Sequence, residues 1–270
     1  MMNLGEKKLW IFDVDNTLIH DVEHPTPFKD ALALWKTLEK KDVELAILTN
    51  VGRLSSRQVN QSLETAGFVL PLEKVFTAGA ATAAYIHNRL PGARCFVISE
   101  GGAQEDFVAR GLDVTNNPPI DFVAVGADRG MTFQELNFAT KMVRDGAKLL
   151  CISGSRDYPG IYLGNEDTFI GELSIVAAIE HATGAESVIV GKPLPEIVVA
   201  TVKALGFVVD DAVIVGDNPA SDIAGGNAAG LTTILVHRDP YNIVSFESGN
   251  LGTKPDITVH SLDEVISKLK

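Results

Sequence analysis

Two aspartates near the start of the chain follow a short apolar segment at a spacing suited to holding a cation. Leu9 to Phe12 is a run of apolar, aromatic and β-branched residues, which predicts a strand buried on both faces. Asp13 and Asp15 follow at alternate positions, so in an extended chain their side chains share one face. Carboxylates this close repel each other unless a cation or a shared proton intervenes. A hard divalent ion, most simply Mg²⁺, would satisfy both; the alternative is a strand that ends in a solvated turn.

Three later strand ends carry polar residues that suit the same chemistry. They are Thr49 and Asn50 after the apolar run 43–48, Lys192 after 187–190, and Asp217 and Asp222 after 212–215. In an open α/β sheet, ligands bind beyond the carboxyl ends of the strands. Each residue alone has a structural explanation, as a turn, a solvated lysine or a helix cap. Found together at four strand ends, they point to one reaction.

The helix predicted for 55–66 begins soon after Thr49 and Asn50. Its first backbone N–H groups and its dipole would point toward the same strand ends. Ser55, Ser56 and Arg57 are therefore candidates for further phosphate contacts, and the alternative is an ordinary helix cap followed by a solvated arginine.

Apolar runs and helical stripes alternate along the chain, which predicts an α/β fold. Beyond the strands named above, strands are predicted at 75–77, 94–99, 112–115, 122–125, 148–153, 232–236 and 257–259. Helices are predicted at 28–40, 55–66, 78–89, 104–111, 132–145, 171–183, 196–205, 223–229 and 262–269. The segment 153–164 is rich in glycine and proline and is predicted to be a functional loop, and the tail from Tyr241 is predicted to be rich in loops.

Composition narrows the class of protein. With 270 residues, 46% of them hydrophobic, the chain can bury a large core, and two domains are expected. A formal charge of -12 argues against non-specific binding to nucleic acid or anionic membranes, which requires basic patches. Cys95 and Cys151 lie in apolar, strand-like runs and are expected to be buried free thiols. With neither a signal-peptide pattern nor a membrane span expected, a cytoplasmic location is predicted.

The sequence around these strand ends resembles the four motifs of the haloacid dehalogenase (HAD) superfamily of phosphohydrolases. The matching segments are Asp-Val-Asp-Asn-Thr-Leu from Asp13, Leu-Thr-Asn from Leu48, Gly-Lys-Pro from Gly191, and Gly-Asp-Asn-Pro-Ala-Ser-Asp-Ile from Gly216. The segments 79–85 and 121–126 are similar to the NagD-like branch, which includes p-nitrophenyl phosphatases. The resemblance implies a Rossmann-like core (1–80 and 186–270), with a parallel sheet and helices on both faces, and an inserted α/β cap (81–185).

The resemblance also assigns roles to the polar residues at the strand ends. Asp13 would be the nucleophile that forms an aspartyl-phosphate, and Asp15 the general acid and base. Mg²⁺ would be held by the Asp13 carboxylate, the Asp15 backbone carbonyl and Asp217. Thr49, Asn50 and Lys192 would bind the substrate phosphate, and Asp222 would orient Lys192 or a metal-bound water.

Two departures from the family pattern concern the turn after the nucleophile and the cap. Asn16 stands where the family usually has glycine, so asparagine must accept that turn. Many relatives carry Asn-Pro-Asp where this chain has Ser-Gly-Ser-Arg-Asp at 153–157. The candidate specificity residues in the cap are Arg156, Asp157 and Tyr158, with Tyr162 as an alternative aromatic contact.

These observations predict a Mg²⁺-dependent phosphomonoester hydrolase that acts on a small phosphorylated metabolite. Two alternatives stay open: a non-catalytic regulatory module that responds to phosphate or metal, and another HAD reaction such as phosphonate cleavage or phosphomutase chemistry. Relatives of the NagD-like branch often dimerise through the cap, so a homodimer is a further expectation.

Overall fold

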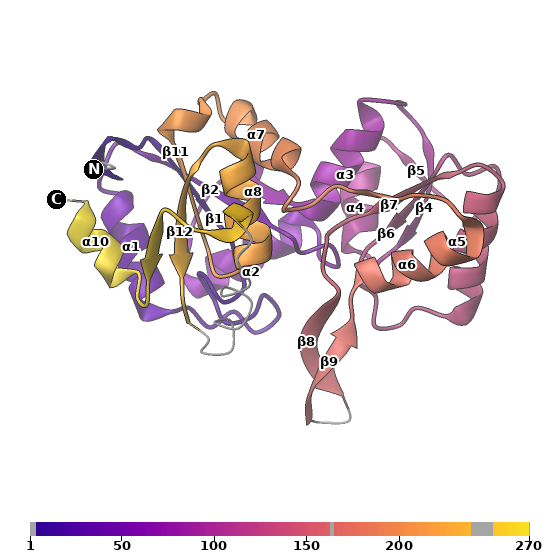
Figure 1. The fold of residues 1–270 in the computed structure, drawn as a ribbon, viewed down its shortest axis with the longest axis horizontal. Helices are drawn as coiled ribbons and strands as arrows, with labels where there is room; N and C mark the ends of the chain where they lie inside the picture. The colour runs from indigo at the N-terminus through magenta and orange to yellow at the C-terminus, as the bar shows by residue number, and fades with distance from the viewer. Residues whose placement is uncertain (1–3, 163–164, 239–250, 270) are drawn as a thin grey trace. The chain divides into compact units, whose positions relative to one another are not determined.

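The computed structural model describes residues 4–162, 165–238 and 251–269. The chain divides into two compact units (Figure 1). The first unit comprises Met1–Thr49, Val59–Phe76 and Lys192–Lys270, and the second comprises Asn50–Gln58 and Thr77–Gly191. Among the described residues, no helix combines the length and the hydropathy needed to cross a membrane.

The first unit is built on a six-stranded sheet with the order β13-β12-β11-β1-β2-β3. The pairings of β1 with β2 and β11, and of β12 with β11 and β13, are all parallel. The strands are β1 (Leu9–Phe12), β2 (Glu44–Thr49), β3 (Val75–Thr77), β11 (Ala212–Gly216), β12 (Thr232–Val236) and β13 (Ile257–Val259). β1 lies inside the sheet, and all four of its residues are buried, as the unbroken apolar run predicts.

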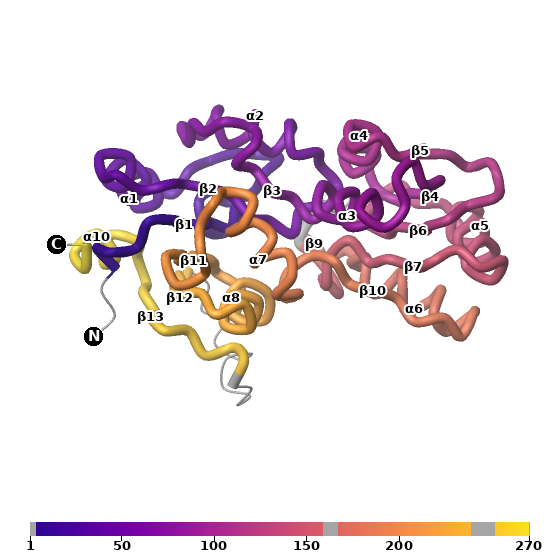
Figure 2. The backbone as a smooth tube through the Cα atoms, turned by 90° about the horizontal axis from the view of Figure 1, so that it is seen from above, coloured from indigo at the N-terminus to yellow at the C-terminus, as the bar shows by residue number. Residues whose placement is uncertain are grey.

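Helices cover both faces of this sheet. α1 and α10 lie on one side of the strands and α7 and α8 on the other (Figures 1 and 2). The α-helices are α1 (Lys29–Leu38), α2 (Ser56–Ala66, whose first turn belongs to the second unit), α7 (Pro195–Ala204), α8 (Ala224–Ala229) and α10 (Asp263–Lys268). Short helical turns are η1 (Leu4–Glu6), η2 (Leu72–Lys74), η3 (Val209–Asp211), the π-helical turn η4 (Pro219–Ile223) and η6 (Leu251–Thr253).

The second unit contains a five-stranded parallel sheet with the order β10-β7-β6-β4-β5. Its strands are β4 (Arg94–Ile98), β5 (Asp113–Val114), β6 (Phe122–Val125), β7 (Lys148–Cys151) and β10 (Val188–Ile189). Its helices are α3 (Ala78–His87), α4 (Gly102–Ala109), α5 (Phe133–Arg144) and α6 (Glu172–Thr183).

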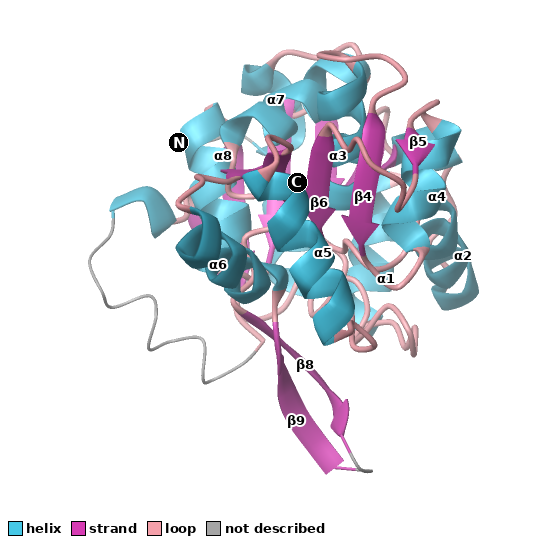
Figure 3. Ribbon diagram, turned by 90° about the vertical axis from the view of Figure 1, so that its right-hand side faces the viewer, coloured by secondary structure: helices cyan, strands magenta, loops and turns pink. Residues whose placement is uncertain are grey.

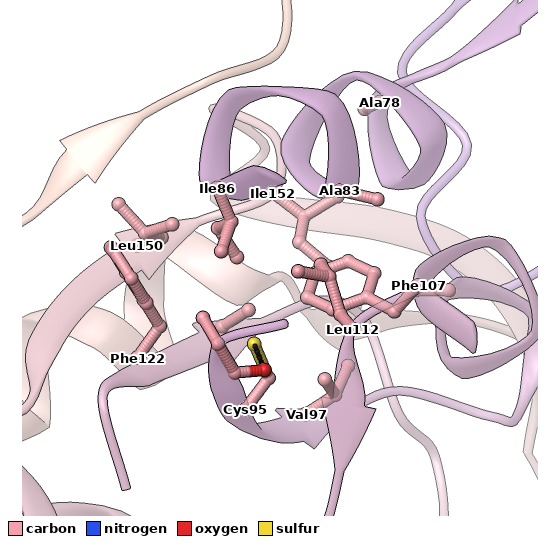
Figure 4. Close-up of a cluster of buried hydrophobic side chains, with 13 residues drawn as sticks. Ala78, Ala83, Ile86, Cys95, Val97, Phe107, Leu112, Phe122, Leu150 and Ile152 are labelled. Carbon is pink, nitrogen blue, oxygen red and sulfur yellow. Dashed lines mark hydrogen bonds between the residues drawn. The ribbon is translucent and has the colours of Figure 1, made fainter. Parts of the chain in front are cut away.

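Side chains alternate across this second sheet and form two hydrophobic clusters. On one face Cys95, Phe122 and Leu150 pack with apolar residues of α3 and α4 (Figure 4). On the other face Val123 and Leu149 pack with apolar residues of α5 and α6. Because successive side chains of a strand point to opposite faces, an uninterrupted apolar strand requires helices on both sides. The predicted α/β fold with parallel sheets is confirmed.

The prediction of a loop at 153–164 is wrong for part of its length. β8 (Asp157–Tyr162) and β9 (Asn165–Ile170) pair antiparallel in a two-stranded ribbon apart from the five-stranded sheet (Figure 3). The rings of Tyr158 and Phe169 lie opposite each other, with centroids 5.7 Å apart. Cross-strand aromatic pairs stabilise such ribbons, and the glycine and proline content of the segment hides this pattern in the sequence. Most of the tail predicted to be rich in loops, up to residue 250, lies outside the described residues.

Candidate active site

Strand register brings three of the four predicted strand ends together in the first unit. Phe12 at the end of β1 is level with Val215 of β11 on one side and Ile47 of β2 on the other. Asp13 therefore leaves the sheet between the ends of both neighbouring strands, and its backbone N–H donates to the carbonyl of Val215 at 2.9 Å. Parallel pairing alone thus places the residues that follow β1, β2 and β11 side by side.

Lys192 is the buried centre of this cluster. Its side chain is 1% exposed, and Nζ donates to Oδ1 of Asp13 at 2.7 Å, to Oδ1 of Asp222 at 2.6 Å and to the carbonyl of Leu48 at 2.7 Å. Burial alone would lower the pKa of Lys192, but the carboxylates of Asp13 and Asp222 outweigh it and raise the pKa. The ammonium group is therefore a fixed positive charge between two carboxylates, not the solvated lysine of the structural alternative.

Asp222 is fully buried and has both carboxylate oxygens in hydrogen bonds. Oδ1 accepts from Lys192, and Oδ2 accepts from the backbone N–H of Asn218 at 3.1 Å. A Cβ at Gly216 would lie 2.2 Å from Oδ2 of Asp222, so only glycine allows this carboxylate to lie against the end of β11. Burial raises the pKa of Asp222 to about 6, although Lys192 acts in the opposite direction.

Asp217 adds a third carboxylate to the same place. Ligand oxygens of Asp13, Asp217 and Asp222 lie within 4.8 Å of one another. Burial raises the pKa of Asp217 well above its ordinary value, and the negative charges of Asp222 and Asp13 raise it further. A divalent cation would offset this repulsion, and carboxylate oxygens are the ligands that Mg²⁺ prefers. Because both oxygens of Asp222 are already hydrogen-bonded, Asp13 and Asp217 fit better as direct ligands.

Asp15 lies in the segment that follows β1. It is half-buried, and its Oδ1 accepts a hydrogen bond from the backbone N–H of Val22 at 2.8 Å. Asn16, next to it, has φ +55° and is the one non-glycine residue with positive φ in the described part of the chain. The expectation that asparagine accepts the turn of the usual glycine is confirmed.

The two predicted phosphate-binding residues after β2 fall in different units. Thr49 is the buried last residue of β2 in the first unit, and Asn50 is the first residue of the second. Asn50 is half-buried, and a Cβ at Gly191 would lie 2.7 Å from its Oδ1. Asn50 and Gly191 are joined by peptide bonds to Thr49 and Lys192, two candidate site residues of the first unit.

The candidates at the start of α2 are engaged in other contacts. The backbone N–H of Ser56 donates to both carboxylate oxygens of Asp106 at 3.2 Å, and Nε of Arg57 lies 3.0 Å from Oε1 of Glu105. These contacts favour the structural alternative, a helix cap and a surface arginine.

The residues of the second unit predicted to set specificity lie at the base of the ribbon. Arg156 and Asp157 are exposed, and Tyr158 is half-buried. The side chain of Tyr162 lies outside the described part of the molecule. Among the described residues, no side-chain contact links Arg156 or Asp157 to the polar cluster around Lys192.

Sequence reasoning missed a charged pair at the carboxyl end of the second sheet. Glu100 and Arg129 follow β4 and β6, and Nε and Nη2 of Arg129 each donate to Glu100 at 2.6 Å. The signal was available, because both residues come soon after predicted strands. Burial raises the pKa of Tyr158, and Glu100 adds to the shift while Arg129 opposes it, so the three side chains belong to one region.

Comparison with known proteins decides the family. A 5'-nucleotidase of Bacillus subtilis, YutF, is 31% identical over 233 residues, which cover 85% of this chain and 87% of that protein. The chain belongs to the HAD-like hydrolases. The family model for haloacid dehalogenase-like hydrolases matches residues 10–113, and a second model for HAD-like hydrolases matches 189–265. An acid sugar phosphatase of Staphylococcus saprophyticus is 28% identical, covering 97% of this chain and 98% of that protein.

Solved structures of the NagD-like branch have the same fold as this HAD-like hydrolase. A 4-nitrophenylphosphatase from Thermotoga maritima matches with a TM-score of 0.88 at 26% identity, covering all of both chains. NagD from Escherichia coli K-12 matches with a TM-score of 0.82 at 28% identity, covering 96% of this chain and 98% of that one. The protein is therefore a NagD-like HAD phosphatase, as the sequence motifs predict.

Proposed function

We propose that this phosphatase is a Mg²⁺-dependent phosphomonoesterase that forms an aspartyl-phosphate on Asp13. The observation that carries the proposal is the buried contact of Lys192 with Asp13 and Asp222, beside the carboxylate of Asp217. The ammonium group of Lys192 fixes one oxygen of Asp13 in place, and a positioned carboxylate oxygen can act as the nucleophile of a covalent mechanism. Asp13 can accept from Lys192 through one oxygen while the other attacks.

The reaction would take place in two displacements. In the first, a carboxylate oxygen of Asp13 forms a bond to phosphorus, the bond from phosphorus to the ester oxygen breaks, and Asp15 donates a proton to the departing alkoxide. In the second, water attacks phosphorus, Asp15 accepts its proton, and the bond to Asp13 breaks to release inorganic phosphate. The hydrogen bond from Val22 to Asp15 supports this assignment, because it fixes one carboxylate oxygen.

Asp13, Asp217 and the backbone carbonyl of Asp15 would hold Mg²⁺. When bound, the ion would neutralise charge on the phosphoryl oxygens and lower the repulsion among the carboxylates. Asp222 would position Lys192, since both oxygens of Asp222 are hydrogen-bonded within the protein.

The phosphate group would be bound by Thr49, Asn50 and Lys192. The hydroxyl of Thr49 and the amide of Asn50 can donate to phosphoryl oxygens, and Lys192 offsets their charge. Together with a bound Mg²⁺, Lys192 would offset the long-range repulsion of a phosphate expected from a chain with a formal charge of -12.

The substrate is proposed to be a small phosphorylated metabolite whose leaving group is selected by the second unit, through Arg156, Asp157 or Tyr158. The relatives named above are phosphatases of a nucleotide, a sugar phosphate and nitrophenyl phosphate, so the family accepts small esters of varied structure. A panel that contains p-nitrophenyl phosphate, sugar phosphates, nucleotides, phosphoglycolate and pyridoxal phosphate would rank these classes.

The decisive experiment traps the covalent intermediate. The enzyme is mixed with p-nitrophenyl phosphate and Mg²⁺, quenched in acid and reduced with borohydride, which converts an aspartyl-phosphate into homoserine. Peptide mass spectrometry should place homoserine at position 13 in the wild type, and not in Asp13→Asn or in samples with EDTA. Full phosphatase activity in Asp13→Asn would overturn the proposal, since an amide cannot act as this nucleophile.

Location and assembly stay predictions. Cys95 and Cys151 are free and buried, which suits a reducing compartment such as the cytoplasm. A homodimer formed through the second unit is proposed from the resemblance to the NagD-like branch. Sedimentation velocity of the purified protein would test it.

A further inference from the structure

Arg238, two residues after β12 in the first unit, contacts the segment 14–28, which carries Asp15, at two places. Nη2 donates to the carbonyl of Thr17 at 3.1 Å, near the start of that segment. The guanidinium lies 3.8 Å from the ring centroid of Phe28, at the end of the segment, and pairs with Asp30 at 3.1 and 3.0 Å. Side chains of both Arg238 and Asp30 are largely buried, at 14% and 12% exposed. No sequence motif marks this arginine.

The segment from Val14 to Phe28, which includes both contact points, folds back on itself. The N–H of Leu18 donates to Val14, and the N–H of Phe28 donates to Leu18, at 2.9 and 3.0 Å. Ile19 and Pro27 form an antiparallel bridge, so the chain turns back on itself. Within the turn, the N–H of Val22 donates to Asp15. Movement of the segment as a whole would therefore move the carboxyl group of Asp15.

Asp30 is itself fixed by the C-terminal part of the unit. Its Oδ2 accepts from the hydroxyl of Ser261 at 3.0 Å and from the backbone N–H of Leu262 at 2.8 Å. The charged groups around Arg238 thus connect α1, β12 and the start of α10. Burial would raise the pKa of Asp30, but the hydrogen bonds from Arg238 and Leu262 outweigh it and lower the pKa, so the pair is ionised at neutral pH.

We propose that Arg238 is a positioning residue that holds the segment 14–28 so that the carboxyl group of Asp15 is aligned with the leaving group. The proposal rests on the proposed role of Asp15. A planar guanidinium can meet both oxygens of Asp30 and a carbonyl at once, in directions that its geometry fixes. The single ammonium of a lysine keeps the charge but cannot make the same set of contacts. Arg238→Lys should therefore leave the first unit folded and misplace Asp15.

Comparing two leaving groups distinguishes a misaligned Asp15 from a loss of activity that does not involve proton donation. Nitrophenolate departs without protonation, whereas phenolate from phenyl phosphate is more basic and gains from a proton donor. The ratio of kcat/KM for phenyl phosphate to that for p-nitrophenyl phosphate reports on proton donation in the first displacement. For Arg238→Lys this ratio should fall about tenfold or more below the wild-type ratio, within the range that general acids contribute.

Three further variants make the result decisive. Asp15→Asn should lower the same ratio; if it does not, the proposed role of Asp15 fails, independently of Arg238. Asp30→Asn should lower the ratio in the same direction as Arg238→Lys. The matched control is Arg94→Lys in the second unit, because Arg94 also joins a carboxylate, Asp113, to a backbone carbonyl, that of Asn117; its ratio should stay at the wild-type value.

If Asp15→Asn lowers the ratio of kcat/KM values, Asp15 acts as proposed, and two outcomes would then overturn the role of Arg238. One is an Arg238→Lys enzyme with wild-type kinetics on both esters. The other is a uniform loss, in which kcat/KM falls by the same factor for both esters, since that is what a merely structural contact would give. Urea unfolding of each variant shows whether the kinetics were measured on folded protein.

Discussion

In both units, charged side chains follow the carboxyl ends of the parallel strands. The charged side chains of the two units differ in how deeply they are buried. In the first unit Lys192 and Asp222 are 1% and 0% exposed, and each ion is neutralised by another buried ion. In the second unit Arg129 and Glu100 are 36% and 17% exposed. The same sheet architecture therefore supports a buried ionic centre in one unit and a partly exposed ion pair in the other. Burial, more than residue type, decides what each pair can do.

The difference has an energetic consequence. An exposed pair gains little, because water solvates the separated ions almost as well. A buried pair is costly to break, because removal of one partner leaves an uncompensated charge in a medium of low dielectric constant. Lys192 of the buried pair also donates to Asp13 and so fixes the position of that carboxylate.

The largest predicted effect is the loss of stability on removing Lys192. Lys192→Met leaves Asp13, Asp217 and Asp222 together without their buried cation, and should lower the free energy of unfolding by about 3–5 kcal/mol. Arg129→Met, which removes the corresponding cation of the second unit, should cost about 1 kcal/mol or less. Urea unfolding in EDTA measures both values, and equal losses would contradict the contrast drawn between the units.

Added Mg²⁺ sharpens the same comparison. A cation that binds only the folded protein stabilises it by mass action. In Lys192→Met the ion supplies positive charge that the variant lacks, so Mg²⁺ should restore more stability there than it adds to Arg129→Met. Calcium-free buffers and matched ionic strength keep the two titrations comparable.

In the first unit, the sequence predicts which strands form and which polar residues follow them. It does not predict the contacts that these polar residues make with one another. Strands β1, β3, β6, β12 and β13 occur at the predicted residues, because uninterrupted apolar runs mark strands covered on both faces. The strand ends also predict that Asp13, Lys192, Asp217 and Asp222 lie close together, and the structure brings these side chains together. What the pattern cannot give is that Lys192 is buried and shared among Asp13, Asp222 and the Leu48 carbonyl, since that depends on three-dimensional packing.

The second unit is less predictable around the ribbon of β8 and β9. The ribbon of β8 and β9 was missed because its only described aromatic pair, Tyr158 and Phe169, lies eleven positions apart and outside any apolar run. Arg238 in the first unit was missed for a related reason: its partners, Thr17 and Asp30, are more than 200 residues away. Long-range polar contacts leave no local periodicity to detect.

The next prediction compares two carboxylates whose pKa values shift in opposite directions, Asp30 in the first unit and Asp106 in the second. For Asp106, burial raises the pKa, although Ser56 and Thr77 donate hydrogen bonds to it. Asp30 has a lowered pKa, so its contribution to stability is present above the ordinary carboxyl pKa of about 4 and is lost as the pH falls through the lowered value. The pKa of Asp106 is raised, so its contribution to stability depends on pH in the opposite direction: stability is lost as the pH rises from the ordinary carboxyl pKa through the raised value.

Asparagine cannot titrate, so substituting each aspartate tests how its carboxyl group changes stability with pH. As the pH rises from acid to neutral, Asp30→Asn should become progressively less stable relative to wild type, and Asp106→Asn progressively more stable. Urea unfolding at several pH values gives both curves. Parallel curves for the two variants would show that the two carboxyl groups do not differ in the way their surroundings indicate.

The smallest predicted effect concerns Asn16, where the chain departs from its family at the turn beside Asp15. At φ +55° a side chain with Cβ is disfavoured, but asparagine tolerates this region better than most residues. Asn16→Gly removes the strain and adds flexibility to the unfolded chain, so the two effects nearly cancel and the stability should change by less than about 1 kcal/mol. Asn16→Ala keeps Cβ but lacks the short polar side chain that lets asparagine tolerate positive φ, and should cost about 1–2 kcal/mol. If the turn is the only role of Asn16, kcat/KM for p-nitrophenyl phosphate should stay near the wild-type value in the glycine variant; a large loss there would mean that the amide itself acts in the site.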